Sequence, residues 1–405
     1  MIEIPQPMKD PGDVVELTRR LVRIPSYVNT QDENGILLPE NQKVDEINVG
    51  SYIYEFLTSH TDLKVIKQPV VDGRFNIIAT NSENPKLFLL GHIDTVPPTE
   101  GSPYDPFAAE IHENKIYGLG ASDMKAGLAG VMSALATLSN LPDLYAAFYI
   151  DEEYDFAGMK KLLEELPKGI KPELLFSADG GNMSVGNGCR GFTKARGTMR
   201  GHTAHAARPH HGVDAITGTT EAMHHLKEHL KPFGNEFLGN STVTISRLNG
   251  GKSSRNQKDE EVIIDGGNKV ADIAQFALDI RTTSPEVNSD LIMRTLVSFC
   301  EQKGLSIENL EFPHEQGAWT TDLKDIKGII SAVEKATGEP VKINDATEFG
   351  YVDLQMAWEA LNRPPAAMFG PEITRTAHTS DEHVNVDDII KARDIFIEVT
   401  NGIKR

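Results

Sequence analysis

The chain has 405 residues, which is more than one hydrophobic core usually supports, so we expect two domains. Its formal net charge of −19 argues against nucleic acid or an anionic membrane as a partner. No apolar run is long enough to span a membrane, and the first residues do not resemble a secretory signal. Two distant cysteines, Cys189 and Cys300, fit a reducing compartment, so we expect a cytoplasmic protein.

Short apolar runs alternate with helical patterns in the first part of the chain. The apolar spacing predicts helices over residues 12–23, 49–59, 124–139 and 156–166. Apolar runs predict strands over residues 63–70, 75–80, 86–90, 145–150 and 173–178. This alternation is typical of an α/β catalytic domain with a mostly parallel central sheet covered by helices. We assign residues 1–191 to it.

The pattern changes near residue 192. Alternating polar and apolar residues predict strands of an antiparallel sheet over 192–205, 241–249 and 274–283, with helices over 212–230 and 288–303. Residues 192–308 are therefore expected to form an inserted α+β domain. Residues 309–405 return to the first domain, with a strand over 365–370 and helices over 323–336, 353–360 and 387–401.

Carboxylates and histidines follow several of the predicted strands at their carboxyl ends, where open α/β sheets bind ligands. They are His92, Asp94, Asp151, Glu152, Glu153, Asp179 and His378, and Asp123 precedes a predicted helix. Taken singly, Asp123 has an ordinary explanation as a helix N-cap, and "DEE" as a solvated loop. Taken together, so many carboxylates at one edge would repel one another unless cations neutralise them.

The types of side chain in this set indicate which metal it would hold. Two histidines and several carboxylates without a thiolate suit Zn²⁺, Co²⁺ or Mn²⁺ better than Mg²⁺ or Ca²⁺. The set is large enough for two ions that share a bridging carboxylate. The H-E-x-x-H pattern of helical zinc proteases and the G-x-S-x-G turn of serine hydrolases are absent from the sequence.

Four ordered motifs resemble a known family: "GHIDTVPP", "GLGASDMKAGLAG", "DEEYDFAG" and "AHTSDEHVNVDD". The resemblance is to the co-catalytic zinc hydrolases that include acetylornithine deacetylase, succinyl-diaminopimelate desuccinylase, aminoacylase and glutamate carboxypeptidase. It covers nearly the whole chain, including "GHTAHAARPHHGVDAI" in the inserted domain. It implies a catalytic domain and an inserted lid or dimerisation domain, and two Zn²⁺ ions for which Co²⁺ or Mn²⁺ can substitute.

The resemblance also implies roles for single residues. The implied metal ligands are His92 and Asp179 on one zinc, Glu153 and His378 on the other, and Asp123 bridging both. Asp94 is expected to hold the imidazole of His92 in its ligating tautomer. Glu152 is expected to act as the general base that takes a proton from the attacking water and returns it to the leaving amine.

Three further residues are implied in the inserted domain. His205 matches the histidine that family dimers donate across their interface to the developing oxyanion, and His202 is a rival for this role. Asn268 and Arg281 match residues that grip a substrate carboxylate, a task for which the arginine fork is suited. Alternatively, Arg281 is a surface charge at a strand end. We expect a homodimer through the inserted domain.

Two departures from the family pattern keep the substrate open. Asp179 stands where the deacylases mostly have glutamate, which favours the family's aminopeptidases and dipeptidases. The link "GGKSSRNQKDEEVIIDGGN" is longer than usual, which weakens the assignment of Asn268. The leading hypothesis is a zinc amidohydrolase that cleaves an N-acyl amino acid. The alternatives are a dipeptidase or other exopeptidase and, more remotely, an inactive binder of small molecules.

Overall fold

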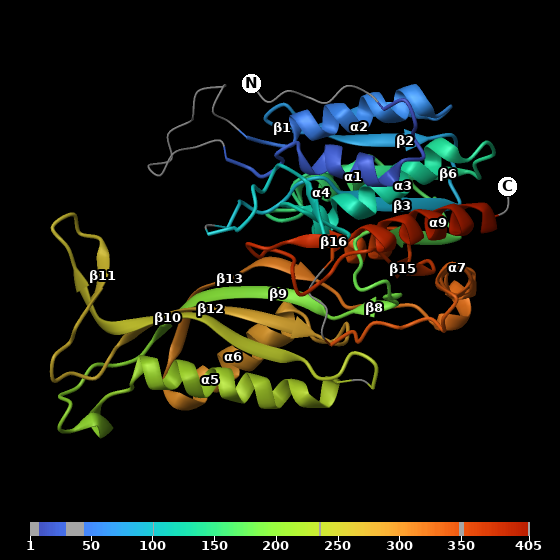
Figure 1. Ribbon diagram of the computed structural model, residues 1–405. Coiled ribbons are helices and arrows are strands. Elements are labelled where there is room, and N and C mark those ends of the chain that lie inside the picture. Colours follow the sequence, from blue (N-terminus) through green and yellow to red (C-terminus); the bar gives the residue numbers. More distant parts are fainter. Residues whose placement is uncertain (1–7, 30–43, 100, 235, 348–351, 404–405) are drawn as a thin grey trace. The chain divides into compact units, whose positions relative to one another are not determined.

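The computed structural model describes residues 8–29, 44–99, 101–234, 236–347 and 352–403 (Figure 1). These residues form two compact units. The first contains the described residues up to Asn187, then Thr320–Asn344, and those from Val352 onward. The second contains Gly188–Trp319 and residues 345–347, so it is inserted into the chain of the first. None of the helices in the described part of the chain is long and apolar enough to cross a membrane.

The predicted end of the inserted domain at residue 308 needs a correction. Strand β13 (Ser306–Gln316) pairs with β9 (Gly191–Arg200), so a boundary at 308 would cut a strand of the inserted sheet. The second unit therefore runs to Trp319 and begins a few residues earlier than predicted, at Gly188. Charged residues and a proline in "ENLEFPHEQ" hide this strand from a search for apolar alternation.

A six-stranded sheet is the centre of the first unit, in the order β1-β2-β6-β3-β7-β15. The strands are β1 (Lys64–Val71), β2 (Arg74–Thr80), β3 (Leu87–His92), β6 (Leu144–Tyr149), β7 (Leu174–Ser177) and β15 (Ala366–Met368). Strands β6, β3, β7 and β15 are parallel, and the hairpin β1–β2 adds an antiparallel edge. Every residue of β3 is buried, which explains the unbroken apolar run that precedes His92.

Helices cover both faces of this sheet (Figure 1). One face packs against α1 (Val14–Val22), α2 (Ile47–His60), α3 (Ala126–Thr137), α7 (Lys327–Thr337) and α9 (Val386–Gly402). The other packs against α4 (Ala157–Glu165) and α8 (Leu354–Ala360). A small sheet of β4 (Glu110–His112), β5 (Lys115–Tyr117) and β16 (His383–Asn385) lies beside them. The predicted α/β catalytic domain with a mostly parallel sheet is confirmed.

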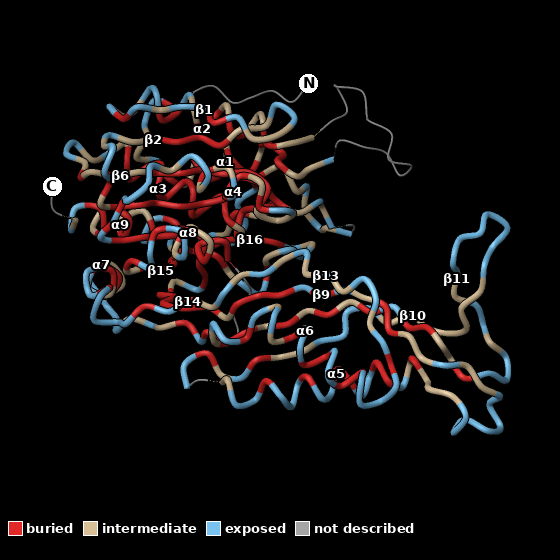
Figure 2. The backbone as a smooth tube through the Cα atoms, turned by 180° about the vertical axis from the view of Figure 1, so that it is seen from behind, coloured by how far each residue is buried: buried red, intermediate tan, exposed pale blue. Residues whose placement is uncertain are grey.

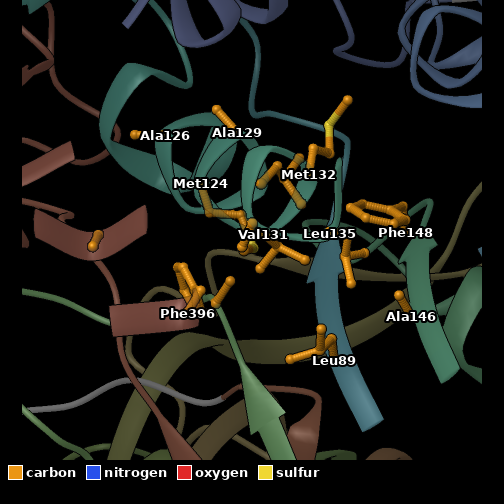
Figure 3. Close-up of a cluster of buried hydrophobic side chains, with 14 of the residues drawn as sticks. Leu89, Met124, Ala126, Ala129, Val131, Met132, Leu135, Ala146, Phe148 and Phe396 are labelled. Atoms are coloured by element: carbon orange, nitrogen blue, oxygen red, sulfur yellow. The ribbon is translucent and has the colours of Figure 1, made fainter. Parts of the chain in front are cut away.

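The small residues of helix α3 let it pack closely on its neighbours. A Cβ atom at Gly127 would lie 2.4 Å from the carbonyl oxygen of Ala178, and one at Gly130 would lie 3.0 Å from the ring of Phe396. Large side chains fill the rest of this core, where Figure 3 shows Leu135 beside Phe148. Helix α3 therefore has little freedom to shift, and it fixes the segment that precedes it.

The second unit is an antiparallel sheet with helices on one face. Its strands follow the order β11-β10-β12-β9-β13, where β10 is Thr242–Arg255, β11 is Glu261–Ile264 and β12 is Ile273–Thr282. Helices α5 (Ala215–Leu230) and α6 (Ser289–Lys303) pack on it, and α5 alternates buried with exposed residues (Figure 2). The short strands β8 (Gly188–Cys189) and β14 (Trp319–Thr320) pair where the chain enters and leaves the unit. The predicted α+β character is confirmed.

The unusually long link after the double glycine is a β-hairpin rather than an open loop. Strand β10 continues to Arg255 and pairs with β11, from Lys252 opposite Ile264 to Arg255 opposite Glu261. Arg200 of β9 donates hydrogen bonds of 2.7 and 2.6 Å to the two carboxylate oxygens of Glu261. This bidentate ion pair ties the hairpin to the main sheet.

Candidate metal centre

Three segments that lie far apart in the sequence meet around the carboxylate of Asp123. His92 is the buried last residue of β3, and its Nε2 atom lies 3.1 Å from Oδ1 of Asp123. The Nε2 atom of His378 lies 3.3 Å from Oδ2 of Asp123 and 2.9 Å from Oε1 of Glu153. Asp123 thus presents one carboxylate oxygen to each histidine, which is the arrangement that a bridging ligand needs.

Donor atoms of His92, Asp123 and Glu153 lie within 4.8 Å of one another, close enough to surround a cation. The pKa shifts within the cluster also indicate that it can hold a cation. Hydrogen bonds to Asp123 and Glu153 raise the pKa of His378 to about 10. Burial alone would raise the pKa of Asp123, but hydrogen bonds from His378 and His92 hold it below the usual range. The carboxylates therefore stabilise positive charge between them, and nitrogen and oxygen donors of this kind fit Zn²⁺.

Asp94 connects His92 to the two adjacent glutamates. Its Oδ1 atom lies 3.5 Å from Nδ1 of His92, and its carbonyl oxygen lies 3.2 Å from the same nitrogen. The two oxygens of its carboxylate accept hydrogen bonds from the backbone N–H groups of Glu152 at 3.1 Å and Glu153 at 3.0 Å. A proton on Nδ1 leaves Nε2 as the ligating atom, and the same carboxylate fixes the backbone of both glutamates.

The carboxylate of Asp151 binds to residues that support the site rather than to the metal-binding cluster. Its carboxylate accepts a hydrogen bond of 3.1 Å from Arg74 and another of 3.2 Å from the backbone N–H of Ala157, at the start of α4. Arg74 also pairs with Glu46 at 2.9 Å. The three carboxylates of "DEE" therefore differ in their surroundings: Asp151 faces Arg74, and Glu153 contacts His378.

Asp179 is buried and Glu152 is partly buried, and both carboxylates lie close to the cluster. Burial raises the pKa of Glu152 well above its usual range, and the charges of Asp353 and Asp179 add to this shift while His92 opposes it. Burial and the negative charge of Asp123 raise the pKa of Asp179 to about 7. A carboxylate with a raised pKa is suited to general acid–base chemistry.

Two further buried carboxylates support the centre and were not singled out in the sequence. Glu382 accepts three backbone hydrogen bonds of 3.0 Å, from Gly120 on one oxygen and from Ser122 and Asp123 on the other. It therefore holds the turn that carries Asp123. Asp353 accepts a hydrogen bond of 2.7 Å from the hydroxyl of Tyr149, and burial raises its pKa to about 7. The motif "SDEH" contains Glu382, but spacing alone does not reveal a contact with the chain some 260 residues earlier.

The remaining predicted residues belong to the second unit. His205 accepts a hydrogen bond of 3.1 Å at Nδ1 from the backbone of Ala207, which leaves the proton on Nε2. The chain beside it pairs with the segment that carries Asn268, whose carbonyl oxygen accepts a hydrogen bond of 2.7 Å from Ala206. The structure thus brings the segments of His205 and Asn268 together. The rival His202 pairs through its backbone with Val213.

Arg281 has an acidic neighbour on its own strand. Its Nε and Nη2 atoms lie 2.9 and 3.4 Å from the two carboxylate oxygens of Asp279. Its guanidinium also stacks 4.6 Å above the ring of Phe192. These two contacts orient the guanidinium of Arg281.

Comparisons with known proteins place these features in a family. The profile of peptidase family M20/M25/M40 matches residues 88–401. The chain is 27% identical over 400 residues to an acetylornithine deacetylase of Proteus mirabilis, covering 94% of each protein. It is 25% identical over 406 residues to that of Pectobacterium carotovorum, covering 95% of this chain and 96% of the relative.

Solved structures share the fold at lower sequence identity. A tripeptidase from Staphylococcus aureus is 19% identical with a TM-score of 0.70, and covers 96% of this chain and 97% of its own. An aminopeptidase PepT from Bacillus cereus is 19% identical with a TM-score of 0.69, and covers 96% of this chain and 98% of its own. With a family profile that spans most of the sequence and a cluster that suits a metal, the chain belongs to peptidase family M20/M25/M40 and is a metal-dependent hydrolase of amide or peptide bonds.

Proposed function

We propose that the protein is a dinuclear zinc amidohydrolase that removes the acyl group from an N-acyl amino acid with a free α-carboxylate. The observation that carries this proposal is the position of Asp123, whose two oxygens face His92 and His378 separately. The acetylornithine deacetylases among the relatives favour an N-acyl amino acid as substrate. Co²⁺ or Mn²⁺ would fit the same donors.

The proposed ligands divide between two ions. His92 and Asp179 would hold one, Glu153 and His378 the other, and Asp123 both. The ions, when bound, lower the pKa of water and polarise the scissile carbonyl. Asp94 keeps Nε2 of His92 free for metal by facing its Nδ1.

The chemistry that this chain supplies itself centres on Glu152. Its carboxylate would accept the proton of the attacking water and then donate that proton to the leaving amine nitrogen. Its backbone is fixed by Asp94, whose carboxylate accepts a hydrogen bond of 3.1 Å from the N–H of Glu152. His205, with its proton on Nε2, would donate a hydrogen bond to the developing oxyanion across a homodimer formed through the second unit. Arg281 and Asn268 would bind the substrate carboxylate.

A dipeptidase or other exopeptidase is the second candidate. Asp179 at the third ligand position favours it. The deacylase and peptidase proposals are distinguished by measuring kcat/KM for N-acetyl amino acids, N-succinyl amino acids and dipeptides. All substrates are used at equal concentrations with Zn²⁺ present. We expect the larger kcat/KM for an N-acyl amino acid. Faster turnover of dipeptides would replace the deacylase proposal with the peptidase one, and no turnover of any substrate would favour the inactive binder.

The cytoplasmic location expected from the sequence stays a prediction. Both cysteines, Cys189 and Cys300, are free thiols and both are buried. Fractionation of the source cells with an antibody against the protein would test it, and recovery outside the cytoplasm would contradict it.

A further inference from the structure

The first unit contains a cavity that none of the proposed catalytic residues lines. Its volume is about 570 Å³, within the range of small-molecule sites. Its walls come from separate elements: β5, the end of α7 and the segment after it, the segment that precedes His378, and the start of α9. Asn182 and Met183, shortly after Asp179, complete it. The cavity therefore shares walls with two loops that carry predicted metal ligands.

Four cationic side chains line this cavity, one from each of four parts of the chain. They are Lys115, Lys342, Arg375 and Lys391. Within the described residues, the structure records no hydrogen bond or ion pair for any of these four side chains. Many other basic residues of the same unit are paired, such as Arg74 with Glu46 and Lys335 with Glu398.

The carboxylates in the same walls do not neutralise these cations by contact. Asp388 accepts a hydrogen bond of 2.7 Å from Asn385, and Glu372 is buried in the wall. Glu339 is exposed at the rim, and no ion pair joins it to the four cations in the described structure. A cluster of unpaired cations is unexpected on a protein with a net charge of −19, because acidic surface groups offer many partners.

From this convergence we propose that the cavity is a binding site for a small, multiply charged anion, a metabolite with carboxylate or phosphate groups. Arg375 can bind such a group with its planar fork, and the three lysines add point charges from the other walls. The site is separate from the metal centre and does not depend on the proposed function. A bound anion would contact the segment that follows Asp179 and the segment that precedes His378.

Binding of two probes to the full-length, zinc-loaded protein tests this proposal. Succinate and inorganic phosphate are titrated separately at constant low ionic strength, and binding is followed by calorimetry. The two arms distinguish a carboxylate ligand from a phosphate ligand. We expect saturable binding of at least one probe, and at least about a tenfold weaker affinity in the double variant Lys342→Gln, Lys391→Gln.

The matched control is the double variant Lys168→Gln, Lys171→Gln, which loses the same charge at exposed lysines outside the cavity. It should bind the probe as the unmodified protein does. Three outcomes would overturn the proposal: no saturable binding of either probe up to about 10 mM, equal loss in both double variants, or undiminished binding in the cavity variant. The last outcome would assign the anion to the metals. Because all four substitutions lie at partly or fully exposed side chains, melting temperatures should show that both variants fold.

Discussion

At the scale of single residues, the adjacent glutamates of "DEE" have different surroundings. Glu153 contacts His378, whereas Glu152 is partly buried and its pKa is affected by the charges of Asp179, Asp353 and His92. We expect Glu152→Gln to keep both metals and to lose about 10²–10⁴-fold in kcat, since only the proton acceptor is removed. Glu153→Gln should bind metal more weakly than the unmodified protein, because a proposed metal ligand is replaced. Metal analysis of both purified variants beside kcat checks this, and full activity of Glu152→Gln would remove the mechanism.

Glu382 offers a second test, because it acts on the site through the backbone. Replacement by glutamine puts an N–H₂ group against at least one of the N–H donors of Gly120, Ser122 and Asp123. We expect metal affinity to fall about 10–100-fold, as for other residues that hold metal ligands. Competition with a chelator of known affinity measures this.

Glu372→Gln is the matched control for that experiment. Glu372 is a similarly buried carboxylate near Asp123 and Asp179, but it holds none of the N–H groups of the Asp123 turn. Its variant should bind metal almost as the unmodified protein does. If both variants lost affinity equally, charge near the site rather than the position of Asp123 would explain the result.

Asp353 gives the pH dependence of stability a definite sign. Burial raises its pKa to about 7, above the value near 4 of an unfolded chain. The folded state therefore holds a proton that the unfolded state has lost, and stability falls as pH rises from about 4 to about 7. Urea unfolding of chelator-treated protein should show this slope, and Asp353→Asn should flatten it. An unchanged slope in the variant would show that Asp353 titrates normally.

At the scale of elements, the position of Asp123 depends on how tightly α3 packs. Gly127→Ala would push a methyl group into the carbonyl of Ala178, and backbone atoms on both sides have little room to move. We expect a loss of about 1–3 kcal/mol of stability and weaker metal binding, since both Asp123 and Asp179 adjoin this contact. Denaturant unfolding and metal titration measure the two effects.

Gly328→Ala provides the control, because this glycine lies in the exposed first turn of α7 with open space around its Cβ position. It should be neutral or stabilise the protein by up to about 1 kcal/mol. Equal destabilisation by both substitutions would mean that the close contact of α3 with Ala178 has no special importance.

The elements that could be predicted from the sequence are those whose pattern reflects burial. Strand β3 is apolar up to His92 because both its faces are covered, and His92 was expected at its carboxyl end. The helix expected from residue 124 starts at Ala126, because Asp123 and Met124 have non-helical backbone angles that turn Asp123 into the site. The strand predicted over 241–249 covers only the first part of β10, and the hairpin that its second part forms with β11 was expected only as a long link.

The site was predictable in part for a related reason. Side chains at the ends of parallel strands must share one edge, so His92, Glu153 and Asp179 could be placed together from order alone. Contacts between residues far apart in the sequence could not be predicted in this way. The pairing of Glu382 with the Asp123 turn and of Asp94 with the backbone of Glu152 depends on loop geometry that spacing does not encode.

At the scale of the whole molecule, our predictions on assembly concern the inserted unit. We predict a homodimer through this unit, in which His205 of one chain serves the centre of the other. Mixing inactive Glu152→Gln chains with inactive His205→Ala chains should restore part of the activity by subunit exchange. If no activity returned although exchange was demonstrated, His205 would not act across the interface, and His202→Ala would be tested in its place.

The central claim is that two metal ions held by this cluster cleave an amide bond. The most direct measurement is a titration of Zn²⁺ into chelator-treated protein, with bound metal and hydrolysis of N-acyl amino acids and dipeptides followed together. We predict no activity without metal, with full activity reached at two ions per chain. Activity that survives complete chelation, or that is complete with no bound ion at His92, Asp123 and His378, would contradict the account.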